Sequence, residues 1–311
     1  MKGIEIAKAY YKTYGEPLLE GEFSYLKDKV AVGYCGSGSE CYGFDDELSK
    51  DHDFAPGFQI FVSDEVDEHD FFLLEKAYRA LPREFMGYQR PFDAPVGGMR
   101  LGVMRYSDFL RDKIGSSDAE LSLEEWLYLP EDMIYEAVNG EIFSDPSHFV
   151  TEIREKLSRY PEEIRRKKLA GEVLFMEQSG SYNYERCLKH NQKEAAQLYL
   201  YRYVNAAMHA IFLLNKTYMP YEKWRFEALS RLEDFSYLKE SFYYLLTHEN
   251  TEEEVRYKTE LIRTIDTLIM EECVKQKIIS MEEDDLEKVA YQINDSIADA
   301  TLRNMHILSG V

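Results

Sequence analysis

The sequence has few residues that could cross-link a fold or anchor it in a membrane. Four of its 311 residues are cysteines, and they form neither a CxxC pair nor a cluster with zinc-site spacing. This pattern favours free thiols in a reducing compartment over disulfides. The most apolar run, residues 204–214, is too short to span a bilayer, and the first residues lack the apolar core of a signal peptide. We therefore expect a cytoplasmic protein without a membrane segment.

Basic residues are also scarce relative to acidic ones. The chain has 37 Lys and Arg against 58 Asp and Glu, which gives a formal net charge of −21. Because a protein that binds a nucleic-acid backbone needs an excess of Lys and Arg, this charge argues against a long nucleic acid as partner. A small molecule, a cationic ligand or a protein is favoured instead, and the sequence does not determine the oligomeric state.

The residues that are present indicate a globular protein with two differently built parts. Hydrophobic residues make up 45% of the chain. Short β-favouring runs occur at residues 29–34, 57–63 and 99–106, with a helix predicted over 67–80. After Ser122 the strand signal fades, and helical stretches are predicted at 147–159, 162–177, 191–214, 221–232, 252–275 and 281–307. The predicted fold is α+β, with a small mixed-sheet domain over residues 1–118 and an all-α helical bundle over 119–311.

One segment, residues 36–54, has a composition suited to phosphate chemistry. It begins where a predicted strand ends, and its glycines allow a tight turn that can direct backbone N–H groups at an anion. Asp51 and Asp53 follow, separated by one residue, so an extended chain would place both carboxylates on one face. Mg²⁺ prefers oxygen ligands and is often shared between carboxylates and the phosphates of a nucleotide. The segment therefore predicts metal-assisted phosphoryl chemistry.

The same segment resembles a known signature. Gly38-Ser39, then Gly43, then Ser49 and Asp51-x-Asp53, is similar to the motif of the polymerase-beta-type nucleotidyltransferases, which include the minimal and aminoglycoside nucleotidyltransferases. The longer context looks like a bacterial branch of that superfamily, a domain of unknown function with a helical C-terminal half. The later segments that carry this likeness are residues 124–127, 139–146, 159–161 and 218–224.

The resemblance implies a role for each matching residue. Gly38 and Ser39, with Ser49 nearby, would hold the phosphates of a nucleoside triphosphate. Asp51 and Asp53 would bind Mg²⁺ or Mn²⁺, and a substrate hydroxyl would attack the α-phosphorus and release pyrophosphate.

Two further roles depend on residues outside the motif. The family's third carboxylate has no clear counterpart in residues 99–106, so Asp108 just beyond them is the catalytic candidate and Asp93 before them the alternative. Lys223 could reach a phosphate from the helical domain, or it could cover the neighbouring Trp224. Asp45 is expected in a solvated loop.

These observations give one leading function and two alternatives. We expect a Mg²⁺-dependent nucleotidyltransferase that moves a nucleoside monophosphate to a hydroxyl of a small molecule or a protein. The missing third carboxylate suggests instead a catalytically silent module that binds a nucleotide or a partner. Arg202 and His209, seven residues apart on a predicted helix, resemble the Arg-x₄₋₆-His motif of the HEPN ribonucleases. A buried polar pair in the helical bundle is the favoured explanation of these two residues.

Overall fold

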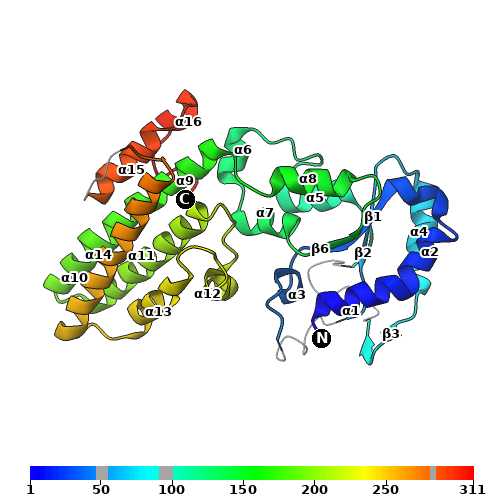
Figure 1. The fold of residues 1–311 in the computed structure, drawn as a ribbon, viewed down its shortest axis with the longest axis horizontal. Helices are drawn as coiled ribbons and strands as arrows, with labels where there is room; N and C mark the ends of the chain where they lie inside the picture. Colours follow the sequence, from blue (N-terminus) through cyan, green and yellow to red (C-terminus); the bar gives the residue numbers. More distant parts are fainter. Residues whose placement is uncertain (47–54, 91–100, 281–284) are drawn as a thin grey trace. The chain divides into compact units, whose positions relative to one another are not determined.

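The computed structural model describes residues 1–46, 55–90, 101–280 and 285–311. These residues form two compact units (Figure 1). Unit 1 comprises Met1–Glu120 and Pro130–Ser158, and unit 2 comprises Leu121–Leu129 and Arg159–Val311. The expected α+β class is confirmed, since unit 1 contains a small mixed sheet and the described part of unit 2 is helical. The division by function at residue 118 stays a prediction.

Four strands form the main sheet of unit 1, in the order β5-β2-β1-β6. The central strand β1 runs antiparallel to both neighbours, whereas β2 and β5 are parallel. Three strands lie within the runs predicted from sequence, while β6 was not expected. A separate hairpin pairs β3 with β4. The strand bounds are β1 Val30–Tyr34, β2 Gln59–Val62, β3 Glu84–Phe85, β4 Tyr88–Gln89, β5 Gly102–Arg105 and β6 Glu141–Ser144.

Helices cover both faces of this sheet. Because side chains alternate along a strand, Val32 and Ile60 face a core that includes Tyr10 of α1 and Leu74 of α4. On the opposite face, Phe61 packs against the aromatic rings at the start of α5. The helices of unit 1 are α1 Gly3–Tyr10, α2 Glu16–Glu20, α3 Ser39–Tyr42, α4 Glu68–Ala80, α5 Tyr106–Ile114, α7 Glu131–Val138 and α8 Phe149–Leu157.

Unit 2 is a helical bundle in which α11 packs against α9 and α14. Its α14 has the bounds predicted from sequence, but the single helix expected over residues 281–307 is wrong. Two shorter helices occur there, and the second begins where Asp299 accepts a hydrogen bond from the Leu302 amide. The bounds are α6 Leu123–Tyr128, α9 Glu162–Met176, π-helix η4 Glu177–Tyr184, α10 Glu185–Lys189, α11 Lys193–Leu214, α12 Arg225–Leu229, α13 Lys239–Thr247, α14 Glu252–Lys275, α15 Leu286–Asp295 and α16 Ala300–Asn304.

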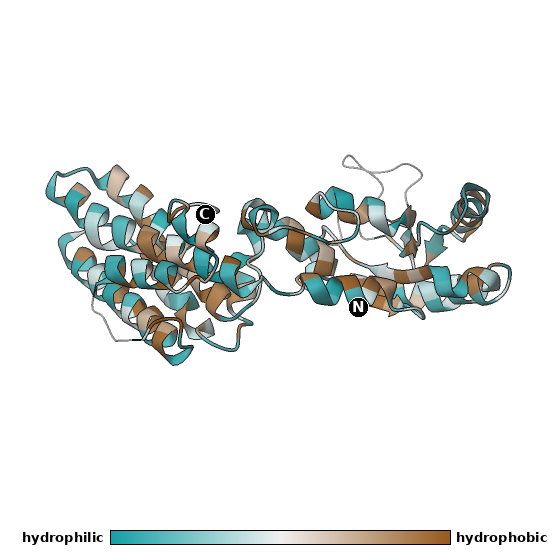
Figure 2. Ribbon diagram, turned by 90° about the horizontal axis from the view of Figure 1, so that it is seen from above, coloured by the Kyte–Doolittle hydropathy of each residue, from teal (hydrophilic) through white to brown (hydrophobic). Residues whose placement is uncertain are grey.

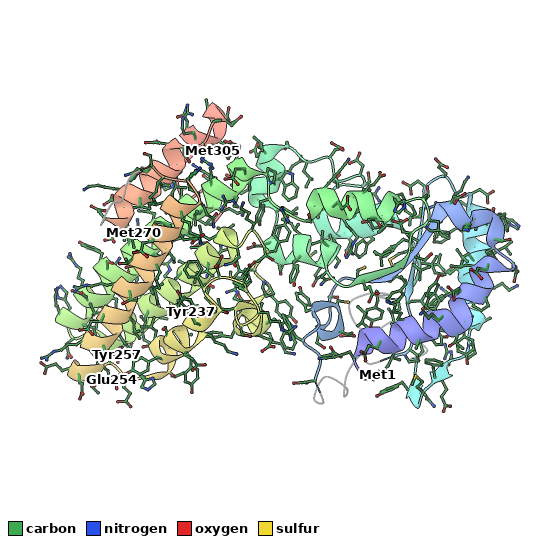
Figure 3. All side chains as sticks on the ribbon, viewed as in Figure 1. Met1, Tyr237, Glu254, Tyr257, Met270 and Met305 are labelled. Atoms are coloured by element: carbon green, nitrogen blue, oxygen red, sulfur yellow. The ribbon has the colours of Figure 1, made fainter. Side chains whose placement is uncertain are left out.

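The surfaces of the helices are mixed in polarity. Figure 2 shows hydrophilic and hydrophobic residues interspersed along the helices of both units. Among the described residues, no helix has the combination of length and apolarity that a membrane crossing requires. The first turns of α14 contact α13 through polar and aromatic groups. Tyr244 of α13 donates a hydrogen bond to Glu254 and packs edge-on against Tyr257. Glu254 and Tyr257 are labelled in Figure 3.

Candidate functional site

The Gly-Ser loop of unit 1 lies at one edge of the sheet. Strand β1 ends at Tyr34, and the loop follows directly, with α3 beginning at Ser39. Because β1 is antiparallel to β2 and β6, and β2 is parallel to β5, the starts of all three neighbouring strands meet the same edge. The first residues of β2, β5 and β6 therefore lie at the same edge as the loop, which makes this edge the candidate site.

Two buried side-chain amides hold the first residues of the loop. Gln59 of β2 accepts a hydrogen bond from the Cys35 amide at 2.8 Å and donates one to the Cys35 carbonyl at 2.9 Å. Asn139, which ends α7, makes the same pair of bonds with Gly36, both at 2.8 Å. Beyond Tyr34 the backbone no longer pairs with a neighbouring strand, and these two side-chain amides supply the missing hydrogen bonds. The backbone of Cys35 and Gly36 is therefore held in one position.

Glycines shape the rest of the loop. Gly36 and Gly38 have φ values of 103° and 119°, and Gly43 ends α3 in the left-handed region with φ of 70°. Gly140 is placed even more tightly, because a Cβ there would lie 2.0 Å from the Tyr34 carbonyl oxygen. Its amide donates to the Cys41 carbonyl at 3.0 Å, which fastens α3 to the start of β6.

Arg154 of α8 organises the other side of Asn139. Its Nη2 donates to the carbonyls of Val138 and Asn139 at 2.7 Å each, so the cation caps the C-terminal end of α7. Its Nη1 lies 3.0 Å from the Sγ of Cys35. Burial raises the pKa of the Cys35 thiol, and the nearby guanidinium opposes this only in part. The thiol therefore remains protonated near neutral pH and acts as a packing group.

Three of the carboxylates at this edge have partners that define their roles. Glu40 is buried and accepts hydrogen bonds from the Tyr34 hydroxyl at 3.1 Å and from the Ser39 hydroxyl at 3.3 Å. Glu141, the first residue of β6, pairs with Lys8. The expectation that Asp45 is solvated is wrong. Its side chain is 3% exposed and accepts a hydrogen bond from the Gly3 amide at 2.8 Å, which ties the loop to the start of α1.

The sequence-predicted residues are only partly brought together. Gly38 and Ser39 lie at the edge as expected, whereas Ser49, Asp51 and Asp53 fall outside the described residues. Within the described ranges, no three His, Cys, Asp or Glu residues gather as a metal site would require.

Asp108 lies away from the loop. It is in the first turn of α5, which follows the last residue of β5, whereas the loop is level with the first residue of that strand. The four-residue strand separates the two ends by about 10 Å. The Asp108 side chain is 63% exposed and pairs with Arg111 at 2.6 Å. The alternative, Asp93, is outside the described residues.

The candidates in unit 2 have structural partners. The Lys223 ammonium lies 4.7 Å from the centre of the Trp224 ring, as expected for a residue that covers this aromatic. His209 is buried and its Nδ1 lies 2.6 Å from Glu172 of α9. Arg202 is exposed and stacks on Phe175, one turn further along α9. Arg202 and His209 thus have separate structural partners, and because Arg202 is exposed the expected buried polar pair is wrong for Arg202 and fits only His209 with Glu172.

Sequence reasoning missed Gln59 and Asn139, the two residues that fix the loop. Asn139 opens one of the segments that carried the family resemblance, so a signal was present without an assigned role. Gln59 had a weaker signal: it is the polar residue within the apolar run at 57–63.

Part of the chain matches a known protein family. Residues 126–225 match a family described as "Domain of unknown function (DUF4037)". The matched segment includes Asn139, the whole of β6 and the helices α7 to α11. No curated protein and no solved structure matches the chain.

Proposed function

We propose that this chain is a Mg²⁺-dependent nucleotidyltransferase, which moves a nucleoside monophosphate from a nucleoside triphosphate to a hydroxyl of a small molecule or a protein. One observation carries the proposal: the loop that contains Gly38 and Ser39 is anchored at its start, where Gln59 and Asn139 bind Cys35 and Gly36 at the sheet edge where β2 begins. A fixed loop of this kind can present backbone N–H groups to phosphate oxygens without first losing conformational freedom.

The neighbouring acidic segment is suited to the metal. Asp51 and Asp53 supply the carboxylate oxygens that Mg²⁺ prefers, and they precede β2, whose first residue is Gln59. A bound Mg²⁺ would neutralise part of the triphosphate charge and polarise the α-phosphate. The chain's own part is positioning: the Ser39 hydroxyl donates its one proton to Glu40 at the start of α3, so the backbone N–H groups of the loop are the donors for phosphate oxygens.

The proposal is tested with the double variant Asp51→Asn, Asp53→Asn. Isothermal titration calorimetry with ATP and Mg²⁺ is expected to show binding to the wild type and none to the double variant, with unchanged circular dichroism. Asp108→Asn is the comparison variant, because its carboxylate lies at the other end of the sheet and pairs with Arg111. We expect it to bind as the wild type does. Unchanged affinity in the double variant would show that the site is assigned wrongly.

Transfer is measured separately from binding. The full chain is incubated with α-labelled nucleoside triphosphates, Mg²⁺ and a pool of hydroxyl-bearing small molecules and proteins. Label that moves to any acceptor, and does not move with the double variant, supports the enzyme. Mg²⁺-dependent binding without label transfer or pyrophosphate release would support the silent binding module instead.

A further inference from the structure

A small pocket in unit 2 brings together two segments that the sequence analysis singled out. Arg159 and Tyr160 come from the segment before α9, and Tyr218 comes from the segment after α11. The cavity has a volume of about 110 Å³. Because this is less than the roughly 150 Å³ of a cavity that binds benzene, the pocket suits a small head group better than a whole nucleoside.

The charges around this pocket are mostly positive. Its lining contains Arg159, Arg165 and Lys216 and a single acid, Glu162. Arg165 is 4% exposed and holds that acid with two hydrogen bonds of 2.8 Å. Burial raises the pKa of Glu162, but the hydrogen bonds from Arg165 and Arg166 outweigh it and the pKa is lowered. Glu162 and Arg165 thus neutralise each other, and two cations remain in a chain with a net charge of −21.

The two remaining cations are available for a ligand. Arg159 and Lys216 are both exposed side chains at the mouth of the cavity. Across residues 1–46, 55–90, 101–280 and 285–311, neither side chain has a hydrogen bond or an ion pair. One precedes α9 and the other follows α11, so they reach the cavity from two elements.

The backbone that carries Lys216 is fixed in an unusual conformation. Lys216 has a φ of 56°, and the amides of Lys216 and Thr217 bond back to α11 at 3.1 and 3.2 Å, which closes the helix end. Glycine adopts this conformation without strain, whereas lysine does not. Arg165 and Gln276 donate to the carbonyls of Leu213 and Leu214 at 3.1 and 2.8 Å and hold the same turn in place.

We propose that this pocket binds a phosphate group, as free inorganic phosphate or as the head of a small phosphomonoester. A phosphate carries close to two negative charges near neutral pH, which matches the two unpaired cations of the lining. The start of α9 adds the positive end of a 15-residue helix beside Glu162. Tyr160 and Tyr218, whose rings meet edge-on at 4.8 Å, form an aromatic wall. This site is independent of nucleotidyl transfer.

The test uses the full chain in EDTA, without Mg²⁺, so that metal-dependent binding does not contribute. Both tryptophans, Trp126 and Trp224, belong to unit 2, and tryptophan fluorescence therefore reports its thermal unfolding. Inorganic phosphate and glycerol phosphate are each compared with chloride and acetate at equal ionic strength. We expect both phosphates to raise the unfolding midpoint in proportion to their concentration over their dissociation constant.

Two variants remove the cations, and a third controls for backbone strain. Lys216→Gly and Arg159→Gln are each expected to weaken phosphate binding about tenfold or more. Lys277 has a φ of 58° at the end of α14 and does not line the cavity, so Lys277→Gly should bind like the wild type. Asp51→Asn with Asp53→Asn should also bind unchanged, which separates this site from the proposed nucleotide site.

Each outcome of this unfolding experiment either supports the phosphate site or overturns it. A midpoint that rises with phosphate in the wild type and Lys277→Gly, and much less in the other two single variants, supports the site. An equal rise in all variants is a general salt effect and would overturn the proposal. A rise with acetate as large as that with phosphate would overturn the assignment to phosphate. Stabilisation by inorganic phosphate alone would identify the free anion as the ligand, and stronger stabilisation by glycerol phosphate than by inorganic phosphate would identify a phosphomonoester.

Discussion

Gly140 offers the sharpest test of how the candidate loop is built. It has a φ of 68°, and an added Cβ would lie 2.0 Å from the Tyr34 carbonyl oxygen and 3.0 Å from the Cα of Cys35. Gly115, which ends α5, has nearly the same φ of 70° and nothing within 4 Å of the corresponding position. The two glycines thus share backbone strain and differ in crowding, so Gly140→Ala and Gly115→Ala form a matched pair.

The expected energies follow from these two terms. Alanine at a positive φ costs about 1–2 kcal/mol, and this is the whole effect expected for Gly115→Ala. In Gly140→Ala the backbone around Tyr34 must also move, because no side chain can rotate out of the way. Overpacking and bond-angle strain of this kind cost about 2–4 kcal/mol more. The free energy of unfolding of unit 1 should therefore fall by about 3–6 kcal/mol, a large share of the 5–15 kcal/mol typical of a domain.

The measurement must report on unit 1 alone. Hydrogen exchange of peptides from β1 and β6 does so, while tryptophan fluorescence follows unit 2. Gly140→Ala should lower protection in both strands far more than Gly115→Ala does, and should leave the urea midpoint of tryptophan fluorescence unchanged. Equal loss of protection in the two variants would refute the close approach of Gly140 to the end of β1.

Two further predictions concern buried polar groups. Gln59→Ala leaves the Cys35 amide and carbonyl without their partner and should destabilise unit 1 by about 2–4 kcal/mol, whereas the exposed Gln89→Ala should change stability by less than about 0.5 kcal/mol. Equal rates of hydrogen exchange in β1 of Gln59→Ala and Gln89→Ala would contradict the role of Gln59 in holding the loop. Burial raises the pKa of Asp266 from 3.8 to about 7, with the Tyr203 hydroxyl as hydrogen-bond donor. Between these two pKa values the native state holds a proton that the unfolded state lacks. The free energy of unfolding of unit 2 should therefore fall by up to about 4 kcal/mol as the pH rises from 4 to 7. Urea unfolding at pH 5 and pH 8 should show this difference in the wild type and not in Asp266→Asn. The same difference between the two pH values in both proteins would contradict the prediction.

Much of the fold was predictable because its elements have strong local signals. The apolar runs that became β1, β2 and β5 are bounded by glycines or charged residues. Helix α14 begins at Glu252, directly after Thr251, whose side chain accepts a hydrogen bond from the Glu254 amide. Strand β6 was missed because both of its faces are half-buried, so its residues form neither an apolar run nor a clear alternation. Its pairing depends on the close approach of Gly140 to β1, which sequence periodicity does not encode.

The candidate site was predictable only in its motif. Gly38 and Ser39 are adjacent in a recognisable pattern, but Gln59 and Asn139 act from 24 and 103 residues away, at Cys35 and Gly36. Distances of this kind come from the strand order rather than from local sequence. Asp108 was favoured because it follows a predicted strand. The direction of β5, parallel to β2, places it at the other end of the sheet, and that direction could not be read from the chain.

The loop in unit 1 and the pocket in unit 2 use the same physical device. In each, the backbone leaves a regular element and its freed polar groups are bound by buried or half-buried side chains: Gln59 and Asn139 beyond β1, Arg165 and Gln276 at the end of α11. A turn held in this way is ordered before a ligand arrives, so little conformational entropy is lost on binding. The same device would allow an acidic chain to bind anions at both of the proposed sites. Fixed N–H groups at the first and two cations at the second act over a few ångströms, where they outweigh distant carboxylates that water and salt screen.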